Sequence, residues 1–259
     1  MGALAGHRIV VTRPAGQTES LAGLVRTAGG EPIVFPVIEI RDLPDVRPIH
    51  ELAERLDAFD LAVFISANAV DKAMNLVQSR RAWPARTRVA TIGKGSEKAL
   101  RRFGFTEIIA PTGRFDSETL LELAPLVDVA GKRVVIFRGD GGRELLGDTL
   151  RARGATVEYA ECYRRVRPEA DVAPLLRLWA RGELDAITVT SSEGLHNLYD
   201  MVGKLGQQWL RRTPVFCPHE RIAAAARALG LAQVVETGPG DAGLIAGLEA
   251  FFGKVQRRS

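Results

Sequence analysis

The sequence contains few of the residues that form disulfides or hold metal ions. Among its 259 residues there are two cysteines, Cys162 and Cys217, which lie far apart in the chain. The four histidines show none of the spacings that are typical of metal ligands. We therefore predict neither a disulfide framework nor a metal site, and this composition agrees with a reducing compartment.

Long apolar runs and the common nucleotide-binding motifs are also missing. No apolar run has the length of a membrane span, and no charged-then-apolar signal begins the chain. A P-loop and a GxSxG elbow are absent, and segment 138–142 has the wrong glycine spacing for a GxGxxG motif. We expect a cytoplasmic protein that does not bind membranes. A nucleotide-dependent Rossmann enzyme is the weakest hypothesis.

Neither sign of charge dominates the chain. Lys and Arg number 35 against 31 Asp and Glu, the net charge is +4, and 46% of the residues are hydrophobic. This is a normal globular balance, with enough apolar residues for two ordinary domains or one large one. The small basic excess permits an anionic partner, but the arginines are dispersed and not interleaved with aromatics, which disfavours nucleic-acid binding.

The most informative pattern is an internal repeat. The segment Arg8–Pro14 resembles Arg133–Gly139, and Leu61–Ser66 resembles Ala186–Ser191. Both pairs are separated by an offset of about 125 residues. Such an offset is too long for a solenoid repeat and suits a duplicated block of domain size.

Strands and helices are predicted to alternate. Short Val- and Ile-rich runs predict buried strands at 8–12, 61–65, 88–92, 133–137, 185–190 and 213–217. Amphipathic stretches predict helices at 16–28, 67–79, 95–103, 117–126, 142–153, 192–202, 220–229 and 242–252. This alternation predicts an α/β fold with parallel sheets covered on both faces. The longer runs 33–41 and 156–166 alternate in polarity and carry charges, so we interpret them as interdomain strands and not core strands.

Candidate binding residues follow the predicted strands. In parallel sheets, ligands bind beyond the carboxyl ends of the strands, where helix N-termini present free amides. A Ser or Thr at such a place is usually a plain helix N-cap. Several such ends facing one cleft would also bind several carboxylates. The ends are 12–14, 66–68, 93–96, 138–142, 191–192 and 218–220.

Four individual side chains have competing interpretations. His219 has no evident partner, and a lone histidine is more often structural than catalytic. Asp60 and Asp185 precede equivalent strands, and we expect them to be loop or capping groups and not a catalytic pair. Tyr163 is one of three tyrosines. It is either a packed strand residue or a phenol that donates a proton to a leaving group.

The ordered motifs resemble one family. They read IVVTRP, VFISANAV, VATIGKGSEKALRRFGF, VVIFRGDGGRELLGDTLRARGATVEYAECY and ITVTSSEGL, and the chain is similar to uroporphyrinogen-III synthases over essentially its whole length. The resemblance implies two Rossmann- or flavodoxin-like lobes with parallel sheets, a two-stranded β-ladder that joins them, and a cleft between them. It also implies that the chain crosses over. Residues 1–34 and 167–259 would form one lobe, 51–155 the other, and 35–50 and 156–166 the linker strands.

The resemblance further implies a reaction. Members of this family close hydroxymethylbilane, a linear tetrapyrrole with eight carboxylates, to uroporphyrinogen III with inversion of ring D and loss of water. The implied protein is a monomeric hydro-lyase without cofactor or metal, which takes its substrate by transient hand-over from hydroxymethylbilane synthase. The alternative is a two-lobe protein that binds a small anion without catalysis.

The resemblance also carries over to particular residues. Tyr163 matches the candidate proton donor for loss of the hydroxyl. Where many members have a Gly-Pro-x-Thr-like turn, this chain has His219 to Ile222, so His219 would replace that hydroxyl contact through its ring or its backbone. The residues implied to bind substrate are Thr12, Arg13, Ser66, Ala67, Gly93, Lys94, Ser96, Arg138, Gly139, Ser191, Ser192 and His219.

Overall fold

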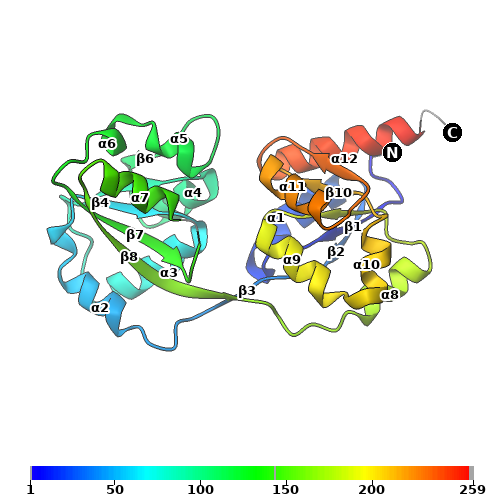
Figure 1. The fold of residues 1–259 in the computed structure, drawn as a ribbon, viewed down its shortest axis with the longest axis horizontal. Helices are drawn as coiled ribbons and strands as arrows, with labels where there is room; N and C mark the ends of the chain where they lie inside the picture. Colours follow the sequence, from blue (N-terminus) through cyan, green and yellow to red (C-terminus); the bar gives the residue numbers. More distant parts are fainter. Residues whose placement is uncertain (1, 143, 257–259) are drawn as a thin grey trace. The chain divides into compact units, whose positions relative to one another are not determined.

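The chain folds into two compact α/β units (Figure 1). The structure is a computed structural model that describes residues 2–142 and 144–256. Unit 1 comprises Met1–Glu39 and Val166–Ser259, and unit 2 is the continuous segment Ile40–Arg165. No helix of the described residues is long and apolar enough to cross a membrane.

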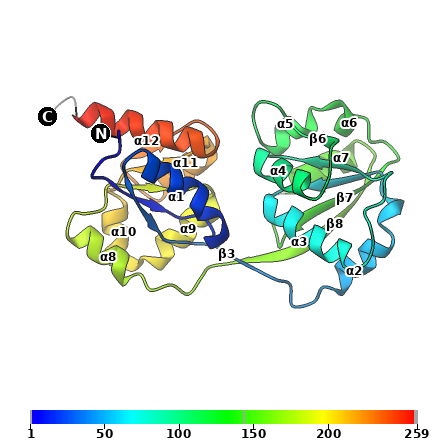
Figure 2. The ribbon, with the colours of Figure 1, turned by 180° about the vertical axis from the view of Figure 1, so that it is seen from behind.

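Unit 1 is built on a five-stranded sheet with the order β11-β10-β9-β1-β2. The pairs β1–β2, β1–β9, β9–β10 and β10–β11 are all parallel. Helices α1 and α12 pack on one face, where they enclose Ile9, Val11 and Phe216 of the sheet; Figure 2 brings this face into view. The strands are β1 (Arg8–Val11), β2 (Glu31–Val34), β9 (Ala186–Thr188), β10 (Val215–Cys217) and β11 (Val234–Glu236). The helices are α1 (Thr18–Thr27), α8 (Ala173–Ala180), α9 (Ser192–Met201), α10 (Gly203–Leu210), α11 (Glu220–Ala228) and α12 (Gly240–Gln256).

Unit 2 is built on a six-stranded sheet with the order β3-β8-β7-β4-β5-β6. The pairs β4–β5, β4–β7, β5–β6 and β7–β8 are parallel. One face packs against α2, α3 and α4 and the other against α5, α6 and α7. The strands are β3 (Glu39–Arg41), β4 (Leu61–Phe64), β5 (Arg88–Thr91), β6 (Ile108–Ile109), β7 (Arg133–Gly139) and β8 (Thr156–Val166). The helices are α2 (Arg47–Glu54), α3 (Ala67–Gln78), α4 (Lys94–Arg102), α5 (Ser117–Leu121), α6 (Ala124–Val127) and α7 (Leu145–Ala152).

The two sheets have matching strand orders. At the offset of the sequence repeat, β1 and β2 correspond to β7 and β8, and β9, β10 and β11 correspond to β4, β5 and β6. The sheet of unit 1 therefore takes two strands from the first half of the sequence and three from the second, whereas the sheet of unit 2 takes four from the first half and two from the second. The α/β fold with parallel sheets agrees with the prediction, and the sequence halves do not coincide with the folded units.

The two segments interpreted as interdomain strands contain both boundaries between the units, as expected, but each also contributes to a sheet. The run 156–166 is β8, and β8 pairs with β7 from Thr156 to Tyr163 inside the sheet of unit 2. The run 33–41 is not one strand, because β2 ends at Val34 and β3 begins at Glu39. The unit boundaries fall after Glu39 and after Arg165. Of the charged residues of β8, Glu161 and Arg164 are exposed and the other two are half-buried, and none prevents the strand from joining a core sheet.

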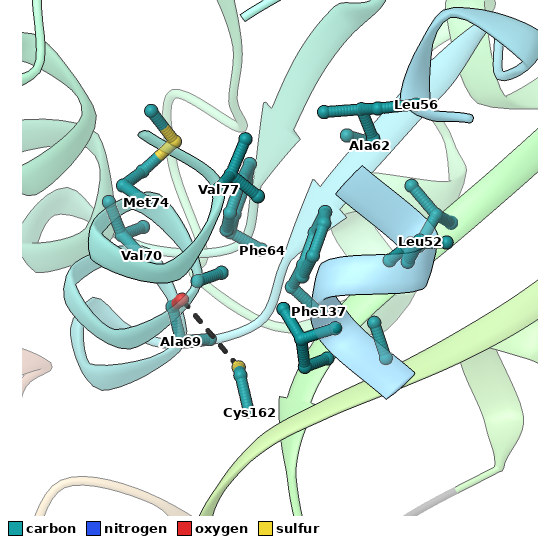
Figure 3. Close-up of a cluster of buried hydrophobic side chains, with 14 of the residues drawn as sticks. Leu52, Leu56, Ala62, Phe64, Ala69, Val70, Met74, Val77, Phe137 and Cys162 are labelled. Atoms are coloured by element: carbon teal, nitrogen blue, oxygen red, sulfur yellow. Dashed lines mark hydrogen bonds between the residues drawn. The ribbon is translucent and has the colours of Figure 1, made fainter. Parts of the chain in front are cut away.

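Aromatic side chains form the centre of one face of unit 2 (Figure 3). Phe64 and Phe137 stack in parallel with their ring centroids 4.8 Å apart, and both side chains are fully buried. Cys162 lies beside them, and its thiol lies 3.7 Å from the carbonyl oxygen of Ala69 and 3.1 Å from that of Arg138. Burial raises the pKa of the Cys162 thiol to about 12.

Both cysteines are expected to be unreactive in the folded protein. Burial also raises the pKa of Cys217 to about 11. Because the thiolate is the nucleophile, iodoacetamide at pH 8 should alkylate either cysteine at least about 100-fold more slowly in the native protein than in urea. Mass spectrometry of timed samples measures both rates. Equal rates in the two conditions would show that the thiols are exposed.

Candidate functional site

Two helices in each unit are separated by two or three residues from the end of a strand that lies inside its sheet. Helices α3 and α4 follow β4 and β5 in unit 2, and α9 and α11 follow β9 and β10 in unit 1. Parallel strands end at the same edge of their sheet, so each unit gathers two helix N-termini at its carboxyl edge. These termini carry free backbone N–H groups and a partial positive charge, which suits the binding of carboxylates.

The serine after β4 and the serine after β9 cap their helices in the same way. Ser66 Oγ accepts a hydrogen bond from the N–H of Ala69 at 3.0 Å, and Ser191 Oγ accepts one from Gly194 at 2.9 Å. Both serines are half-buried. Capping therefore explains the position of each serine, and a substrate contact would be an additional role.

Tyr163 meets one of these caps. Its hydroxyl lies 3.0 Å from Ser66 Oγ, and only 3% of the residue is exposed. Ser66 is more exposed than Tyr163. The contact between their hydroxyls therefore links a buried side chain of β8 to the half-buried start of α3. The burial of the ring confirms the interpretation of Tyr163 as a packed strand residue. Its role as a proton donor stays a prediction.

A β-bulge turns Tyr163 toward Ser66. Arg138 pairs with Glu161, but the next residue of β7, Gly139, pairs with Tyr163, so Cys162 is an extra residue in β8. Side chains alternate along a strand, and one extra residue puts Tyr163 on the same face as Cys162. Both residues belong to the core cluster on the α3 side of the sheet.

Gly139 makes room for the tyrosine ring. A Cβ atom built on Gly139 would lie 2.6 Å from Cε2 and 2.7 Å from Cζ of Tyr163, which is closer than real atoms approach. Arg138 and Gly139 were predicted to follow the strand, whereas both are buried residues of β7 itself. The absence of a side chain at Gly139 is needed for packing.

Arg138 is held in a network of its own. The residue is 6% exposed, its Nη1 donates to Glu144 at 2.9 Å, and its Nη2 lies 3.6 Å from Glu161. Its guanidinium also lies 4.2 Å from the centre of the Tyr159 ring. Nε is buried and has no hydrogen-bond partner among the described residues. The charge of Arg138 is already compensated by two carboxylates.

The predicted residues around α4 have distinct surroundings. Gly93 is the N-cap of this helix and Lys94 its first residue. Lys94 is exposed, and its Nζ lies 5.2 Å from the centre of the Phe115 ring. Ser96 is 5% exposed, whereas Ala67, the first residue of α3, is half-buried. Lys94 is the residue of this group that carries an exposed positive charge.

In unit 1, the predicted residues at the end of β1 make internal contacts. The Thr12 hydroxyl donates to the carbonyl of Thr188 at 2.8 Å, and Thr12 is 3% exposed. Arg13 forms an ion pair with Asp241, with Nη2 and Oδ1 2.5 Å apart. Thr12 thus ties β1 to β9, and Arg13 ties the end of β1 to the first turn of α12.

Ser192 and His219 occupy the starts of α9 and α11. His219 is the N-cap of α11, and its ring Nδ1 accepts a hydrogen bond from the N–H of Arg221 at 3.0 Å. A neutral ring in this arrangement carries its proton on Nε2. The Ser192 hydroxyl is buried without a hydrogen-bond partner in the part of the chain that the structure describes. His219 thus caps α11 through its ring, and its contact with substrate stays a prediction.

Asp60 and Asp185 perform the same structural task in the two units. Asp60 Oδ2 accepts from the N–H of Arg133, and Asp185 Oδ2 accepts from the N–H of Arg8, both at 2.8 Å. Each aspartate thereby holds the first residue of the neighbouring strand. The prediction that they are not a catalytic pair agrees with these bonds.

Two polar features were not found from the sequence. Asp140 follows β7 and hydrogen-bonds with Tyr163 and Arg165 of β8. Glu220 and Glu236 interact at the carboxyl edge of unit 1. A hydrogen bond between them lowers the pKa of Glu220 and raises that of Glu236. These partners belong to different strands or helices, so no local sequence pattern reveals them.

Among the described residues, no group of three or more His, Cys, Asp or Glu side chains is placed to hold a metal ion.

Comparison with known proteins decides the family. The family described as "Uroporphyrinogen-III synthase HemD" matches residues 19–246. The chain belongs to the uroporphyrinogen-III synthase family. The uroporphyrinogen-III synthase of Escherichia coli K12 is 37% identical over 224 residues, which cover 86% of this chain and 91% of that protein. The synthase of Salmonella typhimurium LT2 is 38% identical over 230 residues, with the same coverage. Membership places the chain among the enzymes of porphyrin biosynthesis.

Solved structures show the same fold. A mutant uroporphyrinogen III synthase from the extremely thermophilic bacterium Thermus thermophilus matches with a TM-score of 0.64 at 21% identity, over 97% of this chain and 99% of that one. A uroporphyrinogen-III synthetase from Helicobacter pylori 26695 matches with a TM-score of 0.57 at 14% identity, over 96% and 99%. At these identities, the likeness supports the two-unit α/β architecture alone.

Proposed function

We propose that this protein closes hydroxymethylbilane to uroporphyrinogen III with inversion of ring D and release of water, as a hydro-lyase. The observation that carries the proposal is membership of the synthase family over most of the chain. The alternative of a two-lobe anion-binding protein without catalysis has no such support from the relatives.

The proposed reaction begins with loss of the terminal hydroxyl. The ring nitrogen of the pyrrole supplies electrons, the C–O bond breaks, and the departing oxygen takes a proton from Tyr163 and leaves as water. The resulting methylene is an electrophile, which the substituted carbon of ring D attacks to form a spiro intermediate. Fragmentation and recombination invert this ring, the macrocycle closes, and the proton that the ring-D carbon loses on closure returns to the phenolate of Tyr163. Because the substrate supplies the electrons, this route calls for no cofactor or metal.

In this proposal Tyr163 is the general acid, and Ser66 keeps the phenol in position. The support is the 3.0 Å contact between the two hydroxyl oxygens, together with the bulge that turns the ring toward α3. A positioned acid typically accelerates a reaction by about 10²–10⁴-fold. Control of the substrate's conformation supplies the rest, since the reaction depends on which carbon of ring D attacks.

We propose that the carboxyl edges of the two sheets bind the carboxylates of the substrate. The N-termini of α3, α4, α9 and α11 offer backbone N–H groups, and Lys94 adds an exposed charge. The remaining proposed contacts are Thr12, Arg13, Ser66, Ala67, Gly93, Ser96, Arg138, Gly139, Ser191, Ser192 and His219. Thr12 and Arg138 are buried and already hydrogen-bonded within the protein. Their proposed role is to hold neighbouring residues of the site in place.

The isomer of the product tests the proposed function. Hydroxymethylbilane generated enzymatically is incubated with the protein, oxidised, and separated into porphyrin isomers by chromatography. We expect type III product with the protein and type I product without it, because the free substrate closes without inversion. Type I product alone in both samples would reject the proposal.

We further propose that the protein works as a monomer in the cytoplasm and takes its substrate by transient hand-over from hydroxymethylbilane synthase.

A further inference from the structure

Asp140 joins the end of β7 to the end of β8 through its backbone and its side chain. Its N–H donates to the carbonyl oxygen of Tyr163 at 2.9 Å. Its Oδ1 accepts from the N–H of Arg165 at 2.8 Å, and its carbonyl accepts from Nη2 of the same arginine at 3.1 Å. Oδ2 lies 3.8 Å from Nε of Arg164. One residue thus contacts three consecutive residues of β8.

These contacts lie where the regular ladder ends. The last register pair is Gly139 with Tyr163, directly after the bulge. An extra residue disrupts the ladder locally, so the strand beyond a bulge needs other bonds to fix its direction. Asp140 supplies them on both sides of Arg164. The backbone of Tyr163 is thereby held between the bulge and Arg165, and this sets the direction in which its ring leaves the strand.

The repeat within the chain provides an internal comparison. At the offset of the repeat, Tyr163 corresponds to Ile38 and Asp140 corresponds to Ala15. Ile38 packs against the start of α9, since its Cδ1 is 3.6 Å from a Cβ built on Gly194. Ala15 has a methyl side chain, which can accept no hydrogen bond. Unit 1, which has no tyrosine at the position of Tyr163, therefore also has no hydrogen-bond acceptor side chain at the position of Asp140.

We infer that Asp140 is a positioning residue for Tyr163: through its bonds to Tyr163 and Arg165 it holds the phenol oxygen at Ser66. This inference rests on the proposed function for its effect on catalysis. Asp140 acts through the backbone of β8 and touches neither the phenol nor the reacting atoms. Its side chain matters as a hydrogen-bond acceptor at Oδ1, which an asparagine can also provide.

Kinetics of two substitutions separate this role from a general structural one. Asp140→Ala removes the acceptor, and we expect kcat to fall about tenfold while KM changes less than about twofold, because the misplaced group is the acid and not a substrate contact. Asp140→Asn keeps an oxygen at the same position and should restore at least about half of the wild-type kcat. The matched control is Asp148→Ala on α7, since Asp148 pairs with Arg151 at 3.2 Å on the surface of the same unit.

A spectroscopic measurement tests the geometry without substrate. The chain has three tyrosines. Protein labelled with 3-fluorotyrosine should therefore give three fluorine resonances, assigned by single substitutions to phenylalanine. Asp140→Ala should shift or broaden the Tyr163 resonance and leave that of Tyr199, in unit 1, unchanged. Asp148→Ala and Asp140→Asn should leave the Tyr163 resonance near its wild-type position.

The outcomes distinguish failure of the inference from failure of the proposed function. If the wild-type protein forms only type I product, the proposed function is rejected, and the fluorine spectra still test the positioning. If the wild type is active, and Asp140→Ala keeps its kcat and its Tyr163 resonance, the inference is overturned. Equal losses in Asp140→Ala and Asp140→Asn would also overturn it, because the charge and not the acceptor would then be required.

Discussion

Replacing Tyr163 with phenylalanine is expected to lower kcat for formation of uroporphyrinogen III by about 100-fold, which is the lower end of what a positioned acid contributes. The ring stays in place in this variant, and only the hydroxyl that lies 3.0 Å from Ser66 is lost. Ser66 keeps its capping bond to Ala69, so the start of α3 should not change. KM should stay within about twofold, because the phenol assists departure of the hydroxyl and does not hold carboxylates.

Tyr159→Phe is the matched control for this experiment. Tyr159 lies on the same strand but packs with the helices on the opposite face of the sheet, and its hydroxyl lies 3.4 Å from the carbonyl of Glu144. Its kcat should remain within about twofold of the wild type. Single-turnover kinetics with freshly made hydroxymethylbilane measure both variants. An unchanged rate in Tyr163→Phe would remove the acid role and leave conformational control as the source of catalysis.

Introducing a methyl group at Gly139 is expected to damage both stability and turnover. In Gly139→Ala the new Cβ would lie 2.6 Å from the Tyr163 ring, and the ring cannot retreat easily because 3% of the residue is exposed. Overpacking of this kind costs about 1–3 kcal/mol of unfolding free energy. Displacement of the phenol should lower kcat by about 10- to 100-fold. Urea denaturation and the isomer assay measure the two effects.

Gly113→Ala controls for the added methyl group. Nothing lies within 4 Å of a Cβ built on Gly113, so this variant should match the wild type in stability and rate.

The double variant that combines Gly139→Ala with Tyr163→Phe adds a second test. If Gly139 acts through the phenol, Gly139→Ala should lower kcat no further once the hydroxyl is gone, although the steric loss of stability remains. Additive losses of kcat would show that Gly139 acts through another group.

The architecture was predictable because it is encoded in short-range patterns. Apolar runs separated by amphipathic segments predict parallel strands buried under helices, and the repeat predicts two similar sheets. Three helices were nevertheless missed, namely α2, α8 and α10. Helices α2 and α8 each have a proline in the first turn, where proline fits well. In the sequence alone, however, a proline favours the prediction of a turn or a helix end. Helix α10 begins at Gly203, whose positive φ of 63° separates it from α9.

The details of the site were less predictable, because they depend on partners that lie far away in the sequence. Tyr163 and Ser66 were each singled out, but their contact spans 97 positions and depends on a bulge that only strand pairing creates. Arg138 was named among the residues implied to bind substrate, but the sequence did not reveal that Glu144 and Glu161 neutralise its charge. The role of Asp140 is invisible in sequence for the same reason, since its partners lie on another strand.

The exchange of strands between the two halves of the chain sets the order in which the protein can fold during synthesis. Unit 2 is continuous, so all its strands have been made once Val166 leaves the ribosome. In unit 1, by contrast, β1 pairs with β9, where Ile9 faces Ala186. Strand β1 is synthesised long before β9 and must therefore wait, paired with β2 alone, until β9 emerges. Such long-range pairing slows folding and exposes apolar strand surface in the meantime, which makes the N-terminal strands of unit 1 the part of the nascent chain most in need of protection from aggregation.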